Sequence, residues 1–123
     1  MFENFDIKLI RLKTGEDIIC FCYKDYKNNR AHLRYPKTFY FNYDPETEQE
    51  ELVIIDWLPK KAYALQEAIV DLDQILLTSY STVSFGYKYL DSLLEELDPK
   101  SDVSKSIKET LDEYYTSKDT TIH

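Results

Sequence analysis

The side chains best suited to bind a metal ion are two cysteines and a histidine near the start of the chain. Cys20 and Cys22 are separated by one residue, so on a β-strand both side chains point to the same face, and a neighbouring strand could add His32. No fourth ligand accompanies them, and free cysteines commonly behave as small buried hydrophobic residues. The sequence therefore favours buried thiols, and we predict no metal site and no cofactor.

A second candidate for chemistry is the carboxylate pair Asp71 and Asp73. On a strand both would face the same way, as in sites for acid–base or metal-assisted reactions. The sequence offers no base, nucleophile or phosphate-binding loop beside them, so a solvated turn is the favoured interpretation. The only histidines are His32 and His123, and no Ser-His-Asp motif is present. We predict no catalytic residue and no enzymatic activity.

Aromatic and basic residues are interleaved between residues 26 and 43, as in surfaces that bind single-stranded nucleic acid. The aromatic members are Tyr26, Tyr35, Phe39, Tyr40, Phe41 and Tyr43, and the basic members are Lys27, Arg30, Arg34 and Lys37. Aromatic residues at every second position more often form the core of a β-structure, which is the favoured interpretation. A surface that binds single-stranded RNA is the alternative.

Charge is divided unevenly along this chain of net charge −8. Residues 7–37 contain eight basic and three acidic side chains, whereas residues 38–123 contain seven basic and eighteen acidic ones. Such polarity can provide a basic surface for a ligand, or it can let unlike faces of neighbouring copies attract each other. A solvated surface without a partner is equally compatible with the pattern.

The length and the apolar content predict a single folded domain. The chain has 123 residues, 43% of them hydrophobic, and no apolar run approaches the roughly 18 residues of a membrane span. The first residues lack the pattern of a signal peptide, and two such close cysteines do not make a secreted disulfide framework. We expect a soluble cytoplasmic protein that does not act on a membrane.

The residues that could do chemistry must be positioned by a series of short strands. Gly15 permits the positive φ of a tight hairpin turn between two β-type runs. Pro36 closes a third run and fits an edge or a bend, because it lacks one ladder donor. The predicted strands cover residues 7–12, 18–23, 31–35, 39–43, 52–58 and 68–80, with an acidic loop over 44–51 and a break near 71–74.

From Val83 the apolar period changes to that of a helix, which Asp98-Pro99 ends. Ser81 or Thr82 can cap its start. A second amphipathic pattern follows over residues 103–114. The sequence thus predicts a β-barrel over residues 1–82, a helical extension packed on it over 83–115, and a frayed tail over 116–123.

The β-type part resembles the first motif of the Sm and Sm-like (LSm) family, with its turn glycine at Gly15 and an apolar anchor at Leu33. It is most similar to the short Sm-like proteins of marine phages, with the pattern of Leu12–Ile19, a Trp-x-Pro at Trp57–Pro59 and a late helix rich in Tyr and Leu. The resemblance spans roughly residues 6–97. It implies a mainly β fold with C-terminal helices, in which a strongly bent five-stranded Sm-like (SH3-type) barrel pairs its fourth and fifth strands between copies. The implied assembly is a closed ring of roughly five to seven subunits.

Spacing from Gly15 places the family's RNA-contact positions at Tyr26, Asn29 and Arg30, where the family usually carries Asp, Met and Asn. The Arg-Gly pair of the family's second motif is missing from residues 75–80. The resemblance implies a non-catalytic ring-forming scaffold that binds RNA, or regulates RNA or protein assembly, in the cytoplasm of a phage-infected cell. The alternative is a phage adaptor that binds a host protein through the acidic helical half from Val83 onward, without nucleic acid.

Overall fold

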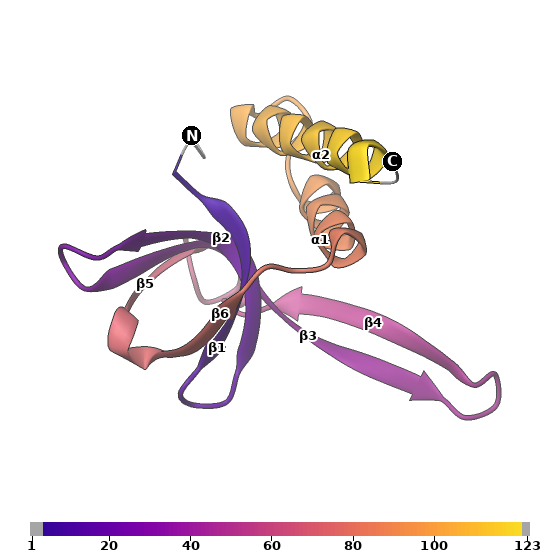
Figure 1. Cartoon of the computed structure of the whole chain (residues 1–123), viewed down its shortest axis with the longest axis horizontal. Coiled ribbons are helices and arrows are strands. Elements are labelled where there is room, and N and C mark those ends of the chain that lie inside the picture. Colours follow the sequence, from indigo (N-terminus) through magenta and orange to yellow (C-terminus); the bar gives the residue numbers. More distant parts are fainter. Residues whose placement is uncertain (1–3, 122–123) are drawn as a thin grey trace. The chain divides into compact units, whose positions relative to one another are not determined.

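The computed structural model describes residues 4–121, which form two compact units, Asn4–Tyr80 and the chain from Ser81 onward (Figure 1). The elements are β1 (Asp6–Leu12), β2 (Asp17–Asp25), β3 (Arg30–Asp44), β4 (Gln49–Asp56), β5 (Glu67–Asp71), the 3₁₀-helix η1 (Leu72–Gln74), β6 (Ile75–Ser79), α1 (Val83–Glu96) and α2 (Asp102–Thr121). The first unit contains the strands and the second contains the α-helices. The predicted order of a β part followed by helices is confirmed.

Within the described residues, six strands form one antiparallel sheet in the order β4-β3-β2-β1-β6, and β5 pairs with β3 outside this path. The 15-residue β3 makes this possible, because its first part pairs with both β2 and β5 and its second part pairs with β4. The sheet thus has six strands, and the five-stranded barrel stays a prediction. The strands expected over 31–35 and 39–43 are one continuous strand.

A β-bulge lets β3 continue through Pro36. Ile19 pairs with Lys37 and Phe21 pairs with Arg34, so Tyr35 and Pro36 lie opposite a single residue of β2. Tyr35 has a φ of 51°, and its N–H donates to Gln66 O over 2.7 Å. The prediction of a bend at Pro36 is confirmed. The prediction that Pro36 ends the strand is wrong, because the bulge accommodates the missing donor.

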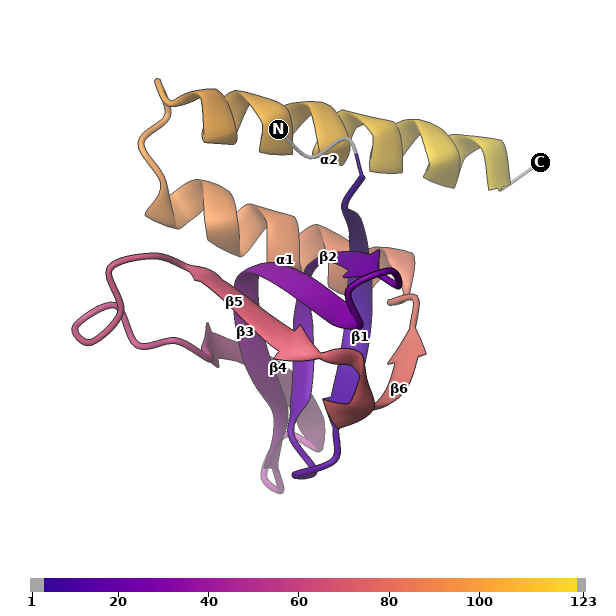
Figure 2. The same ribbon diagram turned by 90° about the vertical axis from the view of Figure 1, so that its left-hand side faces the viewer.

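Half of the acidic segment expected to be a loop over residues 44–51 is strand. The ladder of β3 and β4 runs to the pair Asp44 and Gln49, which leaves only residues 45–48 for the turn. Beyond Thr38, β3 pairs with β4 alone. Figure 1 shows this two-stranded ribbon extending beyond the rest of the sheet, and in Figure 2 it points away from the viewer, behind the other strands. Acidic side chains are tolerated there because water reaches both faces of the ribbon.

The main core of the first unit lies on the inner face of β1, β2 and β3. Its buried members are Ile10, Leu12, Ile18, Cys20, Cys22, Ala31 and Leu33, and Trp57, Ala68, Val70, Leu72 and Ile75 pack against them. Each large apolar side chain contributes roughly 1.5–3 kcal/mol on burial. The expected anchor Leu33 is fully buried. Leu72 and Ile75 bring η1 and β6 onto this core, which positions the residues that line the pocket described below.

The hairpin at Gly15 agrees with its prediction. Gly15 has a φ of 96°, and its N–H donates to Leu12 O over 2.8 Å. The flanking strands pair in antiparallel register, with Arg11 opposite Asp17 and an exposed ion pair of 2.8 Å between these two side chains. A positive φ of this size is accessible to glycine without steric cost.

The second unit is a pair of helices that contact each other. Thr82 caps α1 by accepting from Phe85 N over 3.2 Å, and the apolar face of α1 is buried at Tyr89 and Leu90, among others. Neither α1 nor the described part of α2 is both long and apolar enough to cross a membrane.

Helix α2 is longer than the sequence pattern predicted. It continues to Thr121, so helix replaces the expected tail over residues 116–121. Residues 122 and 123 of that tail lie outside the described residues. The packing of the helices on the sheet stays a prediction.

Candidate functional site

The turn between β2 and β3 is held by its own polar side chains. Asp25 accepts two hydrogen bonds from Asn28, 2.7 Å from the side-chain amide and 3.3 Å from the backbone N–H. The side-chain amide of Asn28 is the main cause that lowers the pKa of Asp25. Asn29 adopts the left-handed conformation with a φ of 57°, which Asn tolerates better than most residues. The turn is therefore ordered by local interactions.

The predicted contact residue Asn29 also joins this turn to η1. Its backbone oxygen accepts from Leu72 N over 3.0 Å, and its side-chain amide donates to Asp73 Oδ2 over 3.2 Å. The Asn29 amide is therefore already engaged by the protein. Asp71 ends β5 whereas Asp73 belongs to the 3₁₀-helix, so the two carboxylates do not share one strand face. This agrees with a solvated turn rather than a catalytic pair.

The other two predicted contact residues lie on either side of the turn. Tyr26 is 76% exposed, and Arg30 is the exposed first residue of β3, opposite Asp71 of β5. The structure thus brings all three predicted residues to one turn. Of the three, Tyr26 lines a pocket.

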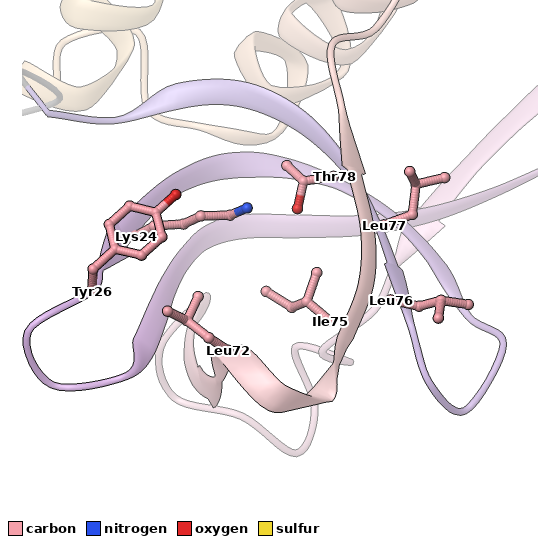
Figure 3. A pocket seen from close by; sticks show the side chains of 7 residues that line it. All are labelled: Lys24, Tyr26, Leu72, Ile75, Leu76, Leu77 and Thr78. Carbon is pink, nitrogen blue, oxygen red and sulfur yellow. The ribbon is translucent and has the colours of Figure 1, made fainter.

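This pocket has a volume of about 330 Å³ and lies between the end of β2 and the segment formed by η1 and β6 (Figure 3). It is lined by Lys24, Tyr26, Leu72, Ile75, Leu76, Leu77 and Thr78. Most of these side chains are apolar. Figure 3 shows the Lys24 ammonium directed across the pocket toward Thr78, beside the ring of Tyr26.

Two polar groups in the pocket lack partners within the described chain. None of the ion pairs among residues 4–121 includes Lys24, and the shielded hydroxyl of Thr78 has no hydrogen-bond partner there. The positive charge of Lys24 also acts on the thiol of Cys22. A hydrogen bond with Cys20 is the main cause that lowers the pKa of Cys22, and Lys24 and Lys8 add to it. The pocket can therefore accept an apolar group that carries a negative charge.

The three residues weighed as metal ligands do not come together. Cys20 and Cys22 are free thiols in the core, whereas His32 lies opposite Tyr23, on the other face of the sheet, with ring centroids 5.8 Å apart. Burial raises the pKa of the Cys20 thiol well above its usual value. Over residues 4–121, no group of three or more His, Cys, Asp or Glu side chains is arranged to hold a metal ion.

The aromatic residues of β3 were expected in the core, and most are not there. Phe41 and Tyr43 are 56% and 58% exposed, and Tyr40 on the opposite face is also exposed. The reason is the length of β3, which carries these residues beyond the rest of the sheet, where only β4 accompanies them. The core interpretation of this aromatic run is therefore wrong.

Sequence reasoning missed the pocket residues Lys24 and Leu76. One signal was available, because Ile75, Leu76 and Leu77 are three consecutive apolar residues, which on a strand cover both faces. Leu76 and Leu77 are more than half exposed, and such a run on an end strand indicates an apolar surface outside the core. The position of Lys24 had no local signal, since it depends on β6 pairing with β1.

No protein-family model matches this sequence, and a comparison with curated proteins gives no match either. The site's own residues and geometry therefore carry the functional argument.

Proposed function

We propose that this chain is a non-catalytic scaffold whose first unit is an SH3-type barrel and whose copies associate into a closed ring of roughly five to seven subunits. The observation that carries the proposal is a pair of strand edges with exposed apolar side chains. Within the described chain, β5 pairs only with β3 and β6 pairs only with β1, so each has a free edge. Free edges of this kind bind other strands.

The strand order supports the barrel part of the proposal. Strand β5 pairs with β3, β6 pairs with β1, and only the short η1 separates β5 from β6. The order β6-β1-β2-β3-β5 therefore bends back toward its own start, as a small barrel requires. On this interpretation β5 and β6 are the fourth and fifth barrel strands, and the β3–β4 ribbon is an additional hairpin.

The side chains on these two strands support association. Ile69 on β5 is 56% exposed, and Leu76 and Leu77 on β6 are 65% and 52% exposed. Large apolar side chains gathered on exposed edges commonly mark interaction surfaces. Because β5 and β6 are different surfaces, their pairing would be heterologous, and such contacts form rings when the rotation closes.

The mass of the native assembly tests this proposal. We expect the intact chain to elute as a multiple of the monomer in size exclusion with light scattering at micromolar concentration. Charged side chains on a strand edge oppose pairing, so Ile69→Lys and Leu76→Lys should lower the mass. Leu65→Lys makes the same chemical change at an equally exposed leucine outside the strands and should not. A monomeric wild-type protein overturns the ring.

A second candidate function, binding of single-stranded RNA, is favoured by one observation at the β2–β3 turn. Tyr26 offers an exposed aromatic ring, and the basic residues Lys24, Lys27 and Arg30 are its neighbours along the chain. Aromatic rings stack on bases, and basic side chains neutralise phosphates, so this combination suits an extended single strand of RNA. In this proposal Asn29 holds the turn in shape, since its amide bonds to Asp73.

Titration with fluorescent oligouridine tests the RNA proposal. Binding should weaken steeply as salt is raised, because phosphate contacts release counterions. Tyr26→Ala should weaken binding several-fold, by roughly 1 kcal/mol or more for the lost stacking. Arg30→Ala should also weaken binding and reduce its salt dependence, because a phosphate contact is lost. Tyr63→Ala removes a half-exposed tyrosine elsewhere and serves as the control. An absence of binding at low salt overturns RNA recognition and favours the protein-interaction adaptor.

A further inference from the structure

The two-stranded ribbon of residues 39–54, here called the arm, has one face with exposed aromatic side chains in its outer part. Directly opposite residues of β3 and β4 share a face, which puts Phe41 beside Leu52 and Tyr43 beside Glu50. Phe41 and Tyr43 are both more than half exposed. A two-stranded ribbon alone is only marginally stable in water, so an arm of this length gains stability when a partner covers it.

The outer part of the arm is strongly acidic. Residues 44–51 contain five carboxylates and no basic side chain. Glu50 is the carboxylate that lies on this aromatic face, directly opposite Tyr43, whereas the next residue, Glu51, lies opposite Asn42 on the other face. The arm therefore presents an aromatic ring and a negative charge side by side.

The pocket beside Tyr26 presents the complementary chemistry. Its wall is mostly leucine and isoleucine, its charge is the ammonium of Lys24, and its unpartnered hydroxyl is that of Thr78 (Figure 3). A volume of about 330 Å³ is at the small end of binding pockets, which suits a single large side chain. An aromatic ring with a carboxylate next to it would fill this wall and pair with Lys24.

The arm extends away from the pocket of its own chain. Figure 1 shows the arm on the opposite side of the first unit from β5 and the short helix η1 that follows it, and η1 contributes to the pocket. The basic partner that the arm requires is nevertheless present in every copy, because residues 7–37 carry the excess of basic charge. A second copy of this chain is therefore the occupant that the charges favour.

We propose that the arm of one copy docks into the Tyr26 pocket of a second copy, with Tyr43 against the apolar wall and Glu50 paired with Lys24. This inference rests on the proposed self-association and specifies one of its contacts. The contact is heterologous, since arm and pocket are different surfaces, so it propagates from copy to copy and is compatible with a ring. It adds to pairing between the edges of β5 and β6 and would compete with RNA at Tyr26.

Neighbouring acidic residues on opposite faces of the arm give a matched test by charge reversal. Glu50→Lys should raise the dissociation constant of the assembly about tenfold or more, because it places a like charge against Lys24. Glu51→Lys makes the same change one residue away on the other face and should have a much smaller effect. Lys24→Glu should weaken assembly as Glu50→Lys does. Sedimentation of each variant over a range of concentrations measures these constants.

Combination of the variants tests the pairing itself. Lys24→Glu with Glu50→Lys in one chain should recover most of the lost affinity, whereas Lys24→Glu with Glu51→Lys should not. An equimolar mixture of the two single variants should also assemble, because each variant then meets an opposite charge on the other. Tyr43→Ser should weaken assembly more than Tyr40→Ser, which changes an exposed tyrosine on the other face.

The outcomes separate this inference from the proposed ring. If the wild-type protein assembles and Ile69→Lys disrupts it, but Glu50→Lys and Glu51→Lys behave alike, the ring stands and the arm contact is wrong. A lack of recovery in the Lys24→Glu, Glu50→Lys double variant also overturns the contact, and leaves another protein as the occupant of the arm. A monomeric wild type overturns both proposals. Far-ultraviolet circular dichroism confirms that each variant is folded.

Discussion

Asn29 donates its side-chain amide to Asp73 Oδ2 across 3.2 Å, and this hydrogen bond joins two segments that are 44 residues apart in the sequence. One segment is the turn that follows β2, and the other is η1. Leu72, which donates to the backbone oxygen of Asn29, reinforces the same connection. Lys24 and Tyr26 on one wall of the pocket are therefore held at a fixed distance from Leu72 and β6 on the other.

Two substitutions at Asn29 separate the backbone contribution from the hydrogen bond. Asn29→Ala places in the left-handed region a residue that has a β-carbon but no side-chain group that can form a hydrogen bond. It should lower the free energy of unfolding by about 2 kcal/mol. Asn29→Gly loses the same hydrogen bond but adopts the positive φ freely, so it should lose about 1 kcal/mol or less. Urea unfolding followed by circular dichroism measures both. Equal losses would show that the left-handed backbone carries no strain.

The ion pair of Lys37 and Asp56 is asymmetric in its burial, which predicts unequal effects of removing its partners. The side chain of Lys37 is 3% exposed and that of Asp56 is 25% exposed. Asp56→Ala leaves the buried ammonium without this carboxylate and should lower the free energy of unfolding by about 3–5 kcal/mol. Lys37→Met fills similar space without a charge, and water still reaches Asp56, so its cost should be clearly smaller. A larger loss for Lys37→Met would contradict this account.

Local signals account for the parts of the fold that the sequence predicted well. The hairpin at Gly15, the helix after Thr82 and the break at residues 71–74 each depend on neighbouring residues, through a positive φ, a cap or a change of period. The length of β3 depends instead on a bulge opposite β2 and on a separate partner beyond it. No local signal marks Tyr35 as left-handed, so the strand appeared to end at Pro36.

The site shows the same division between local and distant determinants. Spacing from Gly15 identified Tyr26, Asn29 and Arg30, which indeed lie together because one short turn holds all three. Their contact with RNA stays a prediction, and the structure adds that the amide of Asn29 bonds to Asp73. Lys24 and Thr78 could not be paired from the sequence, because only the ladder of β1 with β6 brings Thr78 to this side of the sheet.

The buried Cys20 thiol predicts a loss of stability at alkaline pH. Burial raises its pKa in the folded protein, while the unfolded thiol titrates near its usual value of about 8.5. Below that pH both states hold the proton, and the contribution of Cys20 to stability is fully present. As the pH rises toward the folded pKa, only the unfolded state releases the proton, so the contribution is lost at up to about 1.4 kcal/mol per pH unit.

Cys20→Ala tests this contribution when both proteins also carry Cys22→Ala, because the bond with Cys20 lowers the pKa of Cys22 and would be lost with the substitution. The cavity should cost stability at every pH, but the difference between the two proteins should shrink between about pH 8.5 and 10 as the protein with Cys20 loses its thiol contribution. Unfolding by urea under reducing conditions, repeated at several pH values, measures this difference. A difference that stays constant across that interval would show that Cys20 titrates alike in the folded and unfolded states.

The hydrogen bond from Trp57 Nε1 to Glu16 Oε2, 2.6 Å long, joins the residue after β4 to the turn between β1 and β2. This bond holds Trp57, which follows the arm, against the turn. Glu16→Ala removes the acceptor and should lower the free energy of unfolding by about 1–2 kcal/mol, whereas Glu16→Gln retains an acceptor and should lose less. Trp57→Phe removes the donor and part of the packing. If the bond itself is responsible, Glu16→Ala should cost much less in the Trp57→Phe background than in the wild type. Additive losses in this double-mutant cycle would mean that Glu16 stabilises the turn alone, through its bond with Thr14.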